Sequence, residues 1–429
     1  MRAVLVAQET SYLLPWSALI RLMIMPAKNA VASSAVTGAK LVTVMAHSWR
    51  TTRRTFLSLS AGAGLSILAS GGLSTLAAGG ERRIFSSGRI GSLRLKNRLI
   101  RSATSENAFR EGVMTDEGIA IYRALGQGGA GLIITGNMAA MAGGRYTDLQ
   151  TCIYDDRFIP SIRRIAEAVH GAGNGCKVLA QITHTAPEGQ LSDPIAASAT
   201  PRPSWKRQPR AMTAQEVEEM TGQFAQAIRR AKTAGFDGVE IYAAGYLLGS
   251  FLSPYTNTRA DRFGGSLENR VRVIADIISK AQKLVGGNFP ILAKLNCDDG
   301  LEGGTNIDTF PAVAAQVEKA GVAAIDVIGP IGGRNLEPES YFLKYAQKLR
   351  VEVPVILTGG NRNVDRLEQI LQAGPPDFVA MARPLIPEPD LPARRQTRQG
   401  APDAACISCN RCLDGFRQGK ITRCRVNDA

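Results

Sequence analysis

The most constraining feature of this sequence is a series of short, β-rich apolar runs that alternate with longer amphipathic segments after residue 82. Continuous apolar strands separated by helices are typical of parallel sheets that are buried on both faces. Eight such units in a row fit a closed (β/α)8 TIM barrel better than a doubly wound sheet, because no Gly-rich turn follows the first run. We expect strands at 99–103, 131–136, 178–183, 238–243, 290–295, 323–328, 355–359 and 378–382.

The segment 213–235 shows the helical pattern between these strands most clearly. Thr213 and Glu216 have the spacing of a capping box, and Gly235 stands where a helix C-terminus often has glycine. One face of the helix carries apolar residues at helical spacing, namely Val217, Met220, Phe224, Ile228 and Ala231.

The net charge of +14 raises the question of nucleic-acid binding. Basic residues are scattered among acidic ones and are not interleaved with aromatic residues, so the charge pattern argues against a nucleic-acid partner. A mildly attractive field for an anionic cofactor or substrate is the better interpretation.

The first eighty residues have the pattern of a targeting segment rather than of a folded domain. Arg53 and Arg54 precede a weakly apolar, Gly/Ala-rich stretch, which is the pattern of a twin-arginine export signal over residues 45–80. The stretch is too short and too rich in small residues for a stable membrane span. Residues 1–44 carry no domain signature, and we interpret them as an over-extended start or a disordered leader. A functional signal implies a periplasmic or cell-envelope location; otherwise the protein is cytoplasmic.

Glycine-rich turns follow the last two expected strands. Gly359 and Gly360 come directly after strand seven, and Ala382 and Arg383 follow strand eight. Glycines let backbone N–H groups approach a phosphate, and loops seven and eight are the usual phosphate site of such barrels. Arg383 would add a charge-assisted contact. The alternative is a pair of tight turns with a surface arginine.

Several longer segments resemble the Old Yellow Enzyme (NADH:flavin oxidoreductase) family. They are SLRLKNR at 92–98, GAGLIITG at 129–136, AGFDGVE at 234–240 and, above all, GYLLGSFLSPYTNTRADRFGGSLENRVRVI at 245–274. The resemblance covers about residues 83–395 and implies an FMN-binding barrel that takes electrons from NAD(P)H.

The resemblance also implies roles for individual residues around the flavin. Gln181 matches the glutamine that hydrogen-bonds the pyrimidine ring, and Lys294 matches the cation beside flavin N1. Ala103 and Thr104, with Ser105 close by, would contact the flavin edge. A core glutamine and a salt-bridged lysine are the structural alternatives.

The substrate side departs from the family pattern. The usual pair of His, or His and Asn, before Gly-Tyr-Leu is absent, and the segment is one residue shorter. Tyr246 matches the tyrosine that protonates the substrate carbon, although a packed barrel tyrosine is the alternative. Tyr242 is a weaker candidate for the missing oxygen anchor. His184 follows strand three and is a weak candidate for contacting substrate or NAD(P)H, against a structural hydrogen bond.

Four cysteines crowd into a C-terminal extension at residues 396–429. Cys406, Cys409, Cys412 and Cys424 have a metal-type spacing and resemble the [4Fe–4S] segment of 2,4-dienoyl-CoA reductases and trimethylamine dehydrogenase. The alternatives are zinc, free thiols or, after export, disulfides. The isolated Cys152, Cys176 and Cys297 are interpreted as structural thiols.

Three functions remain open from the sequence. The first is an FMN-dependent oxidoreductase that reduces a small unsaturated or carbonyl-activated molecule, alone or as an oligomer. The second is a flavin/iron–sulfur dehydrogenase or demethylase that passes electrons to an external carrier. The third is a flavin-binding protein with little catalysis, which the missing anchor pair suggests.

Overall fold

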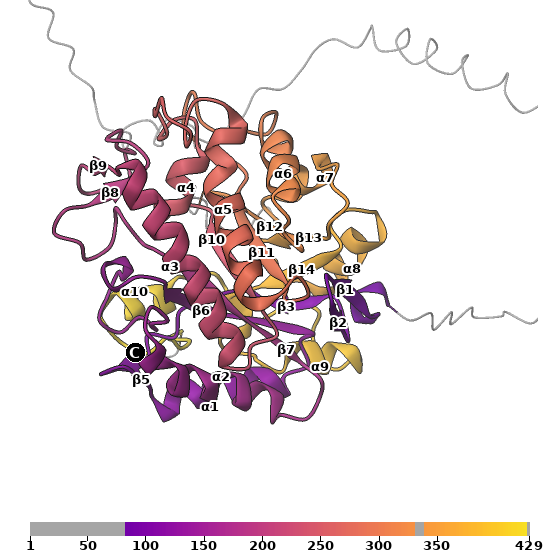
Figure 1. The fold of residues 1–429 in the computed structure, drawn as a ribbon. Helices are drawn as coiled ribbons and strands as arrows, with labels where there is room; N and C mark the ends of the chain where they lie inside the picture. Colours follow the sequence, from indigo (N-terminus) through magenta and orange to yellow (C-terminus); the bar gives the residue numbers. More distant parts are fainter. Residues whose placement is uncertain (1–81, 331–338, 427–429) are drawn as a thin grey trace, which may run out of the picture. The chain divides into compact units, whose positions relative to one another are not determined.

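The computed structural model describes residues 82–330 and 339–426. Within them, eight parallel strands close into a barrel (Figure 1), which confirms the predicted (β/α)8 fold. Each strand pairs with the next in the chain, and the last pairs with the first. In that order the barrel strands are β3 (Leu99–Arg101), β6 (Leu132–Ala139), β7 (Lys177–Thr183), β10 (Gly238–Ala243), β11 (Ile291–Asn296), β12 (Ile325–Ile328), β13 (Val355–Thr358) and β14 (Phe378–Met381).

Helices follow every barrel strand in the described chain and lie outside the barrel, as α3 and α5 do beside β10 and β11 in Figure 1. They are α1 (Asp116–Gln127), α2 (Ile159–His170), α3 (Ala214–Thr233), α4 (Tyr246–Leu252), α5 (Leu267–Val285), α6 (Phe310–Lys319), α7 (Leu343–Lys348), α8 (Val364–Gln372), α9 (Leu391–Gln396) and α10 (Arg411–Arg417). The last two belong to the segment after β14.

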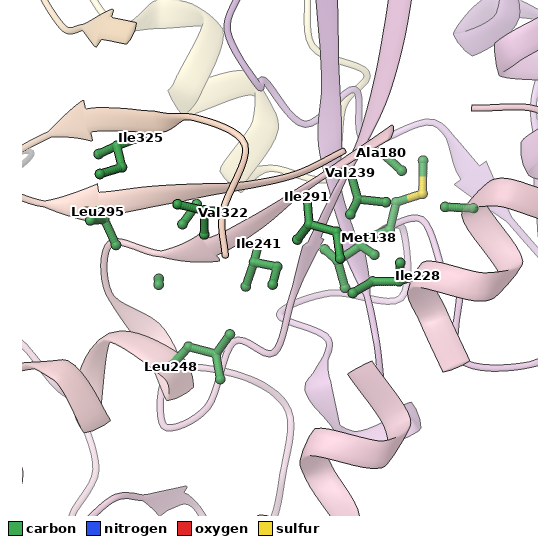
Figure 2. Packing of buried hydrophobic residues seen from close by; sticks show 14 of the residues in the cluster. Met138, Ala180, Ile228, Val239, Ile241, Leu248, Ile291, Leu295, Val322 and Ile325 are labelled. Carbon is green, nitrogen blue, oxygen red and sulfur yellow. The ribbon is translucent and has the colours of Figure 1, made fainter. Parts of the chain in front are cut away.

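Alternating strand residues build two apolar layers, because successive side chains point to opposite faces of the sheet. The outer layer lies between strands and helices, and Figure 2 shows it around Ile241 of β10, Ile228 of α3 and Leu248 of α4. The inner layer fills the lower part of the barrel with Ile100, Leu132, Leu179, Leu292 and Ile356.

A short antiparallel hairpin contributes to the inner layer. It consists of β1 (Gly88–Ile90) and β2 (Leu93–Leu95), and its Ile90 and Leu95 are fully buried in the same cluster. The turn residue Gly91 lies against Ala323 and Pro290, which precede β12 and β11. The hairpin therefore covers the N-terminal end of the barrel, and the carboxyl ends of the strands are left for a ligand. Other loops carry the small pairs β4 (Phe109–Arg110) with β5 (Val113–Met114), and β8 (Ile195–Ala196) with β9 (Arg210–Ala211).

Helix α3 begins and ends where the sequence predicts. Thr213 and Glu216 form the full capping box, and Gly235, with φ +91°, follows the C-cap. The five apolar residues expected on one face are all buried. Hydrogen bonds from Arg210 and from the Thr213 backbone N–H lower the pKa of Glu216 to about 2.

Replacing Thr213 by alanine is expected to lower the free energy of unfolding by about 1 kcal/mol, because the Glu216 N–H loses its acceptor. Denaturant unfolding measures this change. Thr233→Ala at the other end of α3 is the control, since its hydroxyl bonds a carbonyl within the helix. Equal losses in the two variants would show that the cap adds nothing.

The buried thiols agree with a structural role. Cys152, Cys176 and Cys297 are free and buried, and burial raises the pKa of Cys152 to about 11 and of Cys176 to about 12. Such thiols are poor nucleophiles at neutral pH.

The predicted leader and export signal, residues 1–80, lie outside the described residues. None of the helices in the described part of the chain is long and apolar enough to cross a membrane.

Candidate active site

A cavity of about 320 Å³ lies where β3, β12, β13 and β14 end. Because the carboxyl ends of parallel strands meet at one end of a barrel, residues far apart in sequence gather here. Six of the predicted cofactor residues line this one cavity, namely Ala103, Thr104, Gly359, Gly360, Ala382 and Arg383.

The two glycines after β13 form a tight turn that only glycine fits well. Gly359 and Gly360 have φ of +118° and +73°. A Cβ atom would stand 2.7 Å from the Phe342 ring at Gly359 and 2.8 Å from the Tyr341 ring at Gly360. The turn thus presents bare backbone to the cavity, as a phosphate-binding loop requires.

Arg383 lies at the cavity, but its guanidinium faces the C-terminal extension. It donates to Asn410 Oδ1 at 2.9 Å and to the Ser408 carbonyl at 3.4 Å. A second arginine at the cavity, Arg362, was not predicted from the sequence; it follows the glycine turn and pairs with Glu339 at 3.1 Å. Its place three residues after Gly359 was the available signal.

Lys294 lies in a buried polar layer above the apolar filling of the barrel. Its Nζ contacts the Asp326 carboxylate, lies 3.6 Å from Glu240 Oε1 and donates to Ser102 Oγ at 3.4 Å. Burial by itself lowers the pKa of Lys294, but the charges of Asp326 and Glu240 outweigh it and raise that pKa. The lysine is therefore a fixed cation below the cavity. Asp326 also accepts a hydrogen bond from Thr358 Oγ1 at 2.7 Å, and Thr358 lines the cavity.

Gln181 belongs to the same layer. Its Nε2 donates to Glu240 Oε1 at 2.5 Å, which orients the amide group. Glu240 and Asp326, both fully buried, were not predicted as site residues from the sequence. The available signal was a carboxylate inside each of two apolar strands, at a position that faces the barrel interior together with Lys294.

This donor set fits a flavin mononucleotide. An oriented amide and a buried cation offer the donors that a flavin pyrimidine needs, and the glycine turn offers backbone N–H groups to a phosphate. Ala103 and Thr104 lie on the same cavity and would meet the edge of the ring system.

Three further tyrosines lie near the carboxyl ends of the strands but are not among the residues that line the cavity: Tyr242 on β10, Tyr246 at the start of α4 and Tyr146 after β6. Tyr242 and Tyr246 have ring centroids 5.3 Å apart, and Tyr146, which the sequence analysis missed, shares a hydrogen bond with Ser105. Burial, then the neighbouring Tyr242 and Glu188, raises the pKa of Tyr246. Its φ of +51° places it in the left-handed region, where a bulky residue is strained. Such strain is common at functional sites.

His184 is only 2% exposed, and its Nδ1 accepts a hydrogen bond from the Ala186 backbone N–H. Burial lowers the pKa of His184 to about 4. A neutral, backbone-bonded imidazole agrees with the structural alternative for this residue.

Acidification is expected to destabilise the protein through His184. The unfolded chain binds a proton at His184 below about pH 6.5 and the folded protein only below about pH 4, so up to about 3 kcal/mol is lost between these values. His184→Asn keeps an acceptor for Ala186 and removes the titration, so it should lose less stability between about pH 7.5 and about pH 4.5. Unfolding curves at both pH values, with His170→Asn as control, check this. An identical acid loss in His184→Asn and the wild type would contradict it.

The C-terminal extension packs against the β3 loop. Thr422 donates to the Glu106 and Ser105 carbonyls, and Asn107 donates to the Phe416 carbonyl. Cys412 lines the cavity itself. Within residues 82–330 and 339–426, however, no three His, Cys, Asp or Glu side chains are arranged to hold a metal ion. The cysteines therefore stay a candidate for a cluster, which the described side chains do not show.

Fold and site together define a (β/α)8 barrel with a cofactor site at the carboxyl end of its strands. Residues 83–401 match the NADH:flavin oxidoreductase / NADH oxidase family, and the chain belongs to that family. The resemblance seen in the sequence is thereby confirmed.

Individual relatives differ in length. A metal reductase of Desulforamulus reducens is 37% identical over 360 residues, which cover 80% of this chain and 53% of the relative. The chain thus spans about half of that protein. A 4,4'-dithiodibutanoate disulfide reductase of Rhodococcus erythropolis is 31% identical over 396 residues, with 81% of this chain and 95% of the relative covered. Among solved structures, a 2-naphthoyl-CoA reductase complex has a TM-score of 0.75 at 26% identity, and covers 81% of this chain and 57% of that one.

Proposed function

We propose that this protein is an FMN-dependent oxidoreductase that takes electrons from NAD(P)H and reduces a small unsaturated or carbonyl-activated molecule. The observation that carries the proposal is the buried Lys294, which is connected through Asp326 and Thr358 to the wall of a cavity with a glycine turn at its rim. FMN, when bound, supplies hydride transfer.

The protein's own residues would divide the work. Lys294 and Gln181 would hold the pyrimidine end of the flavin. The turn at Gly359 and Gly360 would hold the phosphate, together with Arg383 once its side chain has rotated away from Asn410. Tyr246 would donate a proton to the substrate carbon, because its raised pKa keeps the phenol protonated at working pH. Tyr242, adjacent to it, would contact the substrate oxygen in place of the missing anchor pair.

The absorbance spectrum of the purified protein tests cofactor binding, and stopped-flow mixing tests activity. We expect a flavin spectrum that bleaches with NADH or NADPH and returns when cyclohexenone is added. A bound flavin that no alkene or carbonyl compound reoxidises would contradict the proposed reaction and favour the flavin-binding protein.

A flavin/iron–sulfur dehydrogenase or demethylase is the second candidate, because Cys412 lines the same cavity as the flavin residues. The four C-terminal cysteines would hold a [4Fe–4S] cluster, which would supply electron transfer to an external carrier. Iron and acid-labile sulfide analysis of protein isolated anaerobically decides this. Four of each per chain supports the cluster; zinc, or thiols without metal, leaves the first candidate.

We also propose export through the twin-arginine route, on the strength of Arg53 and Arg54. Cell fractionation with Arg53→Lys/Arg54→Lys as the matched variant tests it. An unchanged distribution would show that the two arginines do not direct export.

A further inference from the structure

One carboxyl group in the polar layer is poorly suited to permanent ionisation. Glu240 is fully buried on β10. Its Oε1 accepts from Gln181 Nε2 and lies 3.6 Å from Lys294 Nζ, but its Oε2 has no hydrogen-bond partner among the described residues. An ionised carboxylate oxygen that is buried without a donor is costly, and protonation of that oxygen removes the uncompensated charge.

The charges around Glu240 also favour the binding of one proton in this layer. Lys294 is already paired more closely with Asp326, which in turn accepts from Thr358. One cation therefore faces two buried carboxylates, so the layer carries a net charge of −1 when both are ionised and is neutral when Glu240 is protonated. Burial, with the neighbouring Asp326, raises the pKa of Glu240 to about 8 despite the opposing charge of Lys294. A hydrogen bond that only the protonated acid can donate to Asp326 contributes to this rise.

We propose that Glu240 takes up a proton from solvent when the flavin bound above Lys294 is reduced, and so balances the new negative charge. This inference rests on the proposed FMN function. Reduction of the flavin to its anionic hydroquinone consumes two electrons and one proton, which goes to N5. Protonation of the Glu240 carboxylate consumes one further proton, so the pair takes up two protons for two electrons.

The sign of the pH dependence follows from the neighbouring groups. Four polar groups among the described residues face Glu240. They are Gln181, Lys294, Asp326 and Tyr242, which lies two residues further along β10. A negative flavin near Lys294 weakens the help that this cation gives to an ionised Glu240, so reduction raises the pKa of Glu240 further. Well below about pH 8 the acid is protonated in both redox states and adds nothing. At and above about pH 8, Glu240 is largely ionised while the flavin is oxidised and becomes protonated when the flavin is reduced. The second proton is therefore taken up only in this pH range.

Spectroelectrochemical titration of the holoprotein between about pH 6 and about pH 9.5 tests the proposal, because the slope of midpoint potential against pH counts protons per two electrons. We expect a count near one at about pH 6 that rises toward two above about pH 8. Protonation of flavin N1 gives the opposite trend, a count that falls from two to one as the pH rises.

Glu240→Gln is the diagnostic variant, because glutamine keeps the acceptor for Gln181 and cannot titrate. Its count is expected to stay at one throughout. Glu368→Gln is the matched control: Glu368 is also buried, but it binds the backbone N–H groups of Arg83 and Ile84 on the outer side of β14. It should behave as the wild type.

Each outcome of the titration either supports or overturns the proposed proton uptake by Glu240. A wild-type count that stays at one or falls with pH overturns the proposal, as does a Glu240→Gln count that still rises to two. If Glu240→Gln fails to bind FMN, the wild-type profile alone decides. A failure of the proposed function is separately visible, because the flavin absorbance itself, or its bleaching by NAD(P)H, would then be missing.

Discussion

Replacing Lys294 by methionine is expected to lower the free energy of unfolding by about 3–5 kcal/mol near neutral pH, the usual cost of removing one partner from a buried ion pair. The lysine side chain is 3% exposed and both carboxylates are fully buried, so Asp326 and Glu240 would remain without a cation. Denaturant unfolding of the flavin-free protein measures the effect. The holoprotein should also lose FMN on gel filtration.

The loss in free energy of unfolding caused by Lys294→Met should become smaller as the pH falls. Without the cation, the pKa of Glu240 rises even further above its unfolded value, so the penalty exists at higher pH and fades as this carboxyl is protonated. Lys348→Met is the control, since Lys348 pairs with Asp308 at the surface, where both side chains are about half exposed or more. That change should cost about 1 kcal/mol or less. Equal losses in free energy of unfolding for Lys294→Met and Lys348→Met would mean that Lys294 does not form a buried ion cluster with Asp326 and Glu240.

Replacing Tyr246 by phenylalanine is expected to slow reoxidation of the flavin by an alkene about 10²–10⁴-fold, the usual contribution of a positioned general acid. Reduction of the flavin by NAD(P)H needs no proton from Tyr246 and should proceed at the wild-type rate. Since burial raises the pKa of this phenol, its ionisation should not affect the wild-type rate below about pH 10. Stopped-flow measurement of the two half-reactions separates them.

Tyr345→Phe is the matched control for this experiment. Tyr345 is a buried tyrosine on α7 whose hydroxyl bonds Asp298, and it lies outside the β10–α4 segment that carries Tyr242 and Tyr246. Its loss should leave both half-reactions unchanged. A Tyr246→Phe variant that reoxidises at the wild-type rate, or that is slowed equally in both half-reactions, would assign Tyr246 to packing.

The local pattern of the chain was enough to predict the barrel and much of its rim. Strand and helix periodicity depend on near neighbours, so the eight strands and the capped helix α3 are readable in order. The glycines at 359 and 360 are equally local, because a positive φ is a property of the residue itself. Parallel strands with short loops then bring such residues to one end of the barrel.

The tertiary structure decided how the charges of the site are arranged. Glu240, Lys294 and Asp326 come from three successive strands, and whether they meet depends on the register between those strands, with Tyr242 opposite Lys294 and Lys294 opposite Asp326. No local pattern carries that register. Contacts between loops are equally hidden from local patterns: Arg383 lines the predicted cavity and also bonds Asn410 of the C-terminal extension, and Tyr146 bonds Ser105.

The sequence alone therefore determined that this chain is a (β/α)8 barrel of the NADH:flavin oxidoreductase family, and it indicated which loops form the cofactor site. Only the tertiary structure decided that Lys294 shares its charge with two buried carboxylates, and that the cysteine segment forms part of the cavity wall. The physical reason is the range of the interactions: backbone preference and amphipathic periodicity act between near neighbours, whereas buried charges interact across strands far apart in the chain.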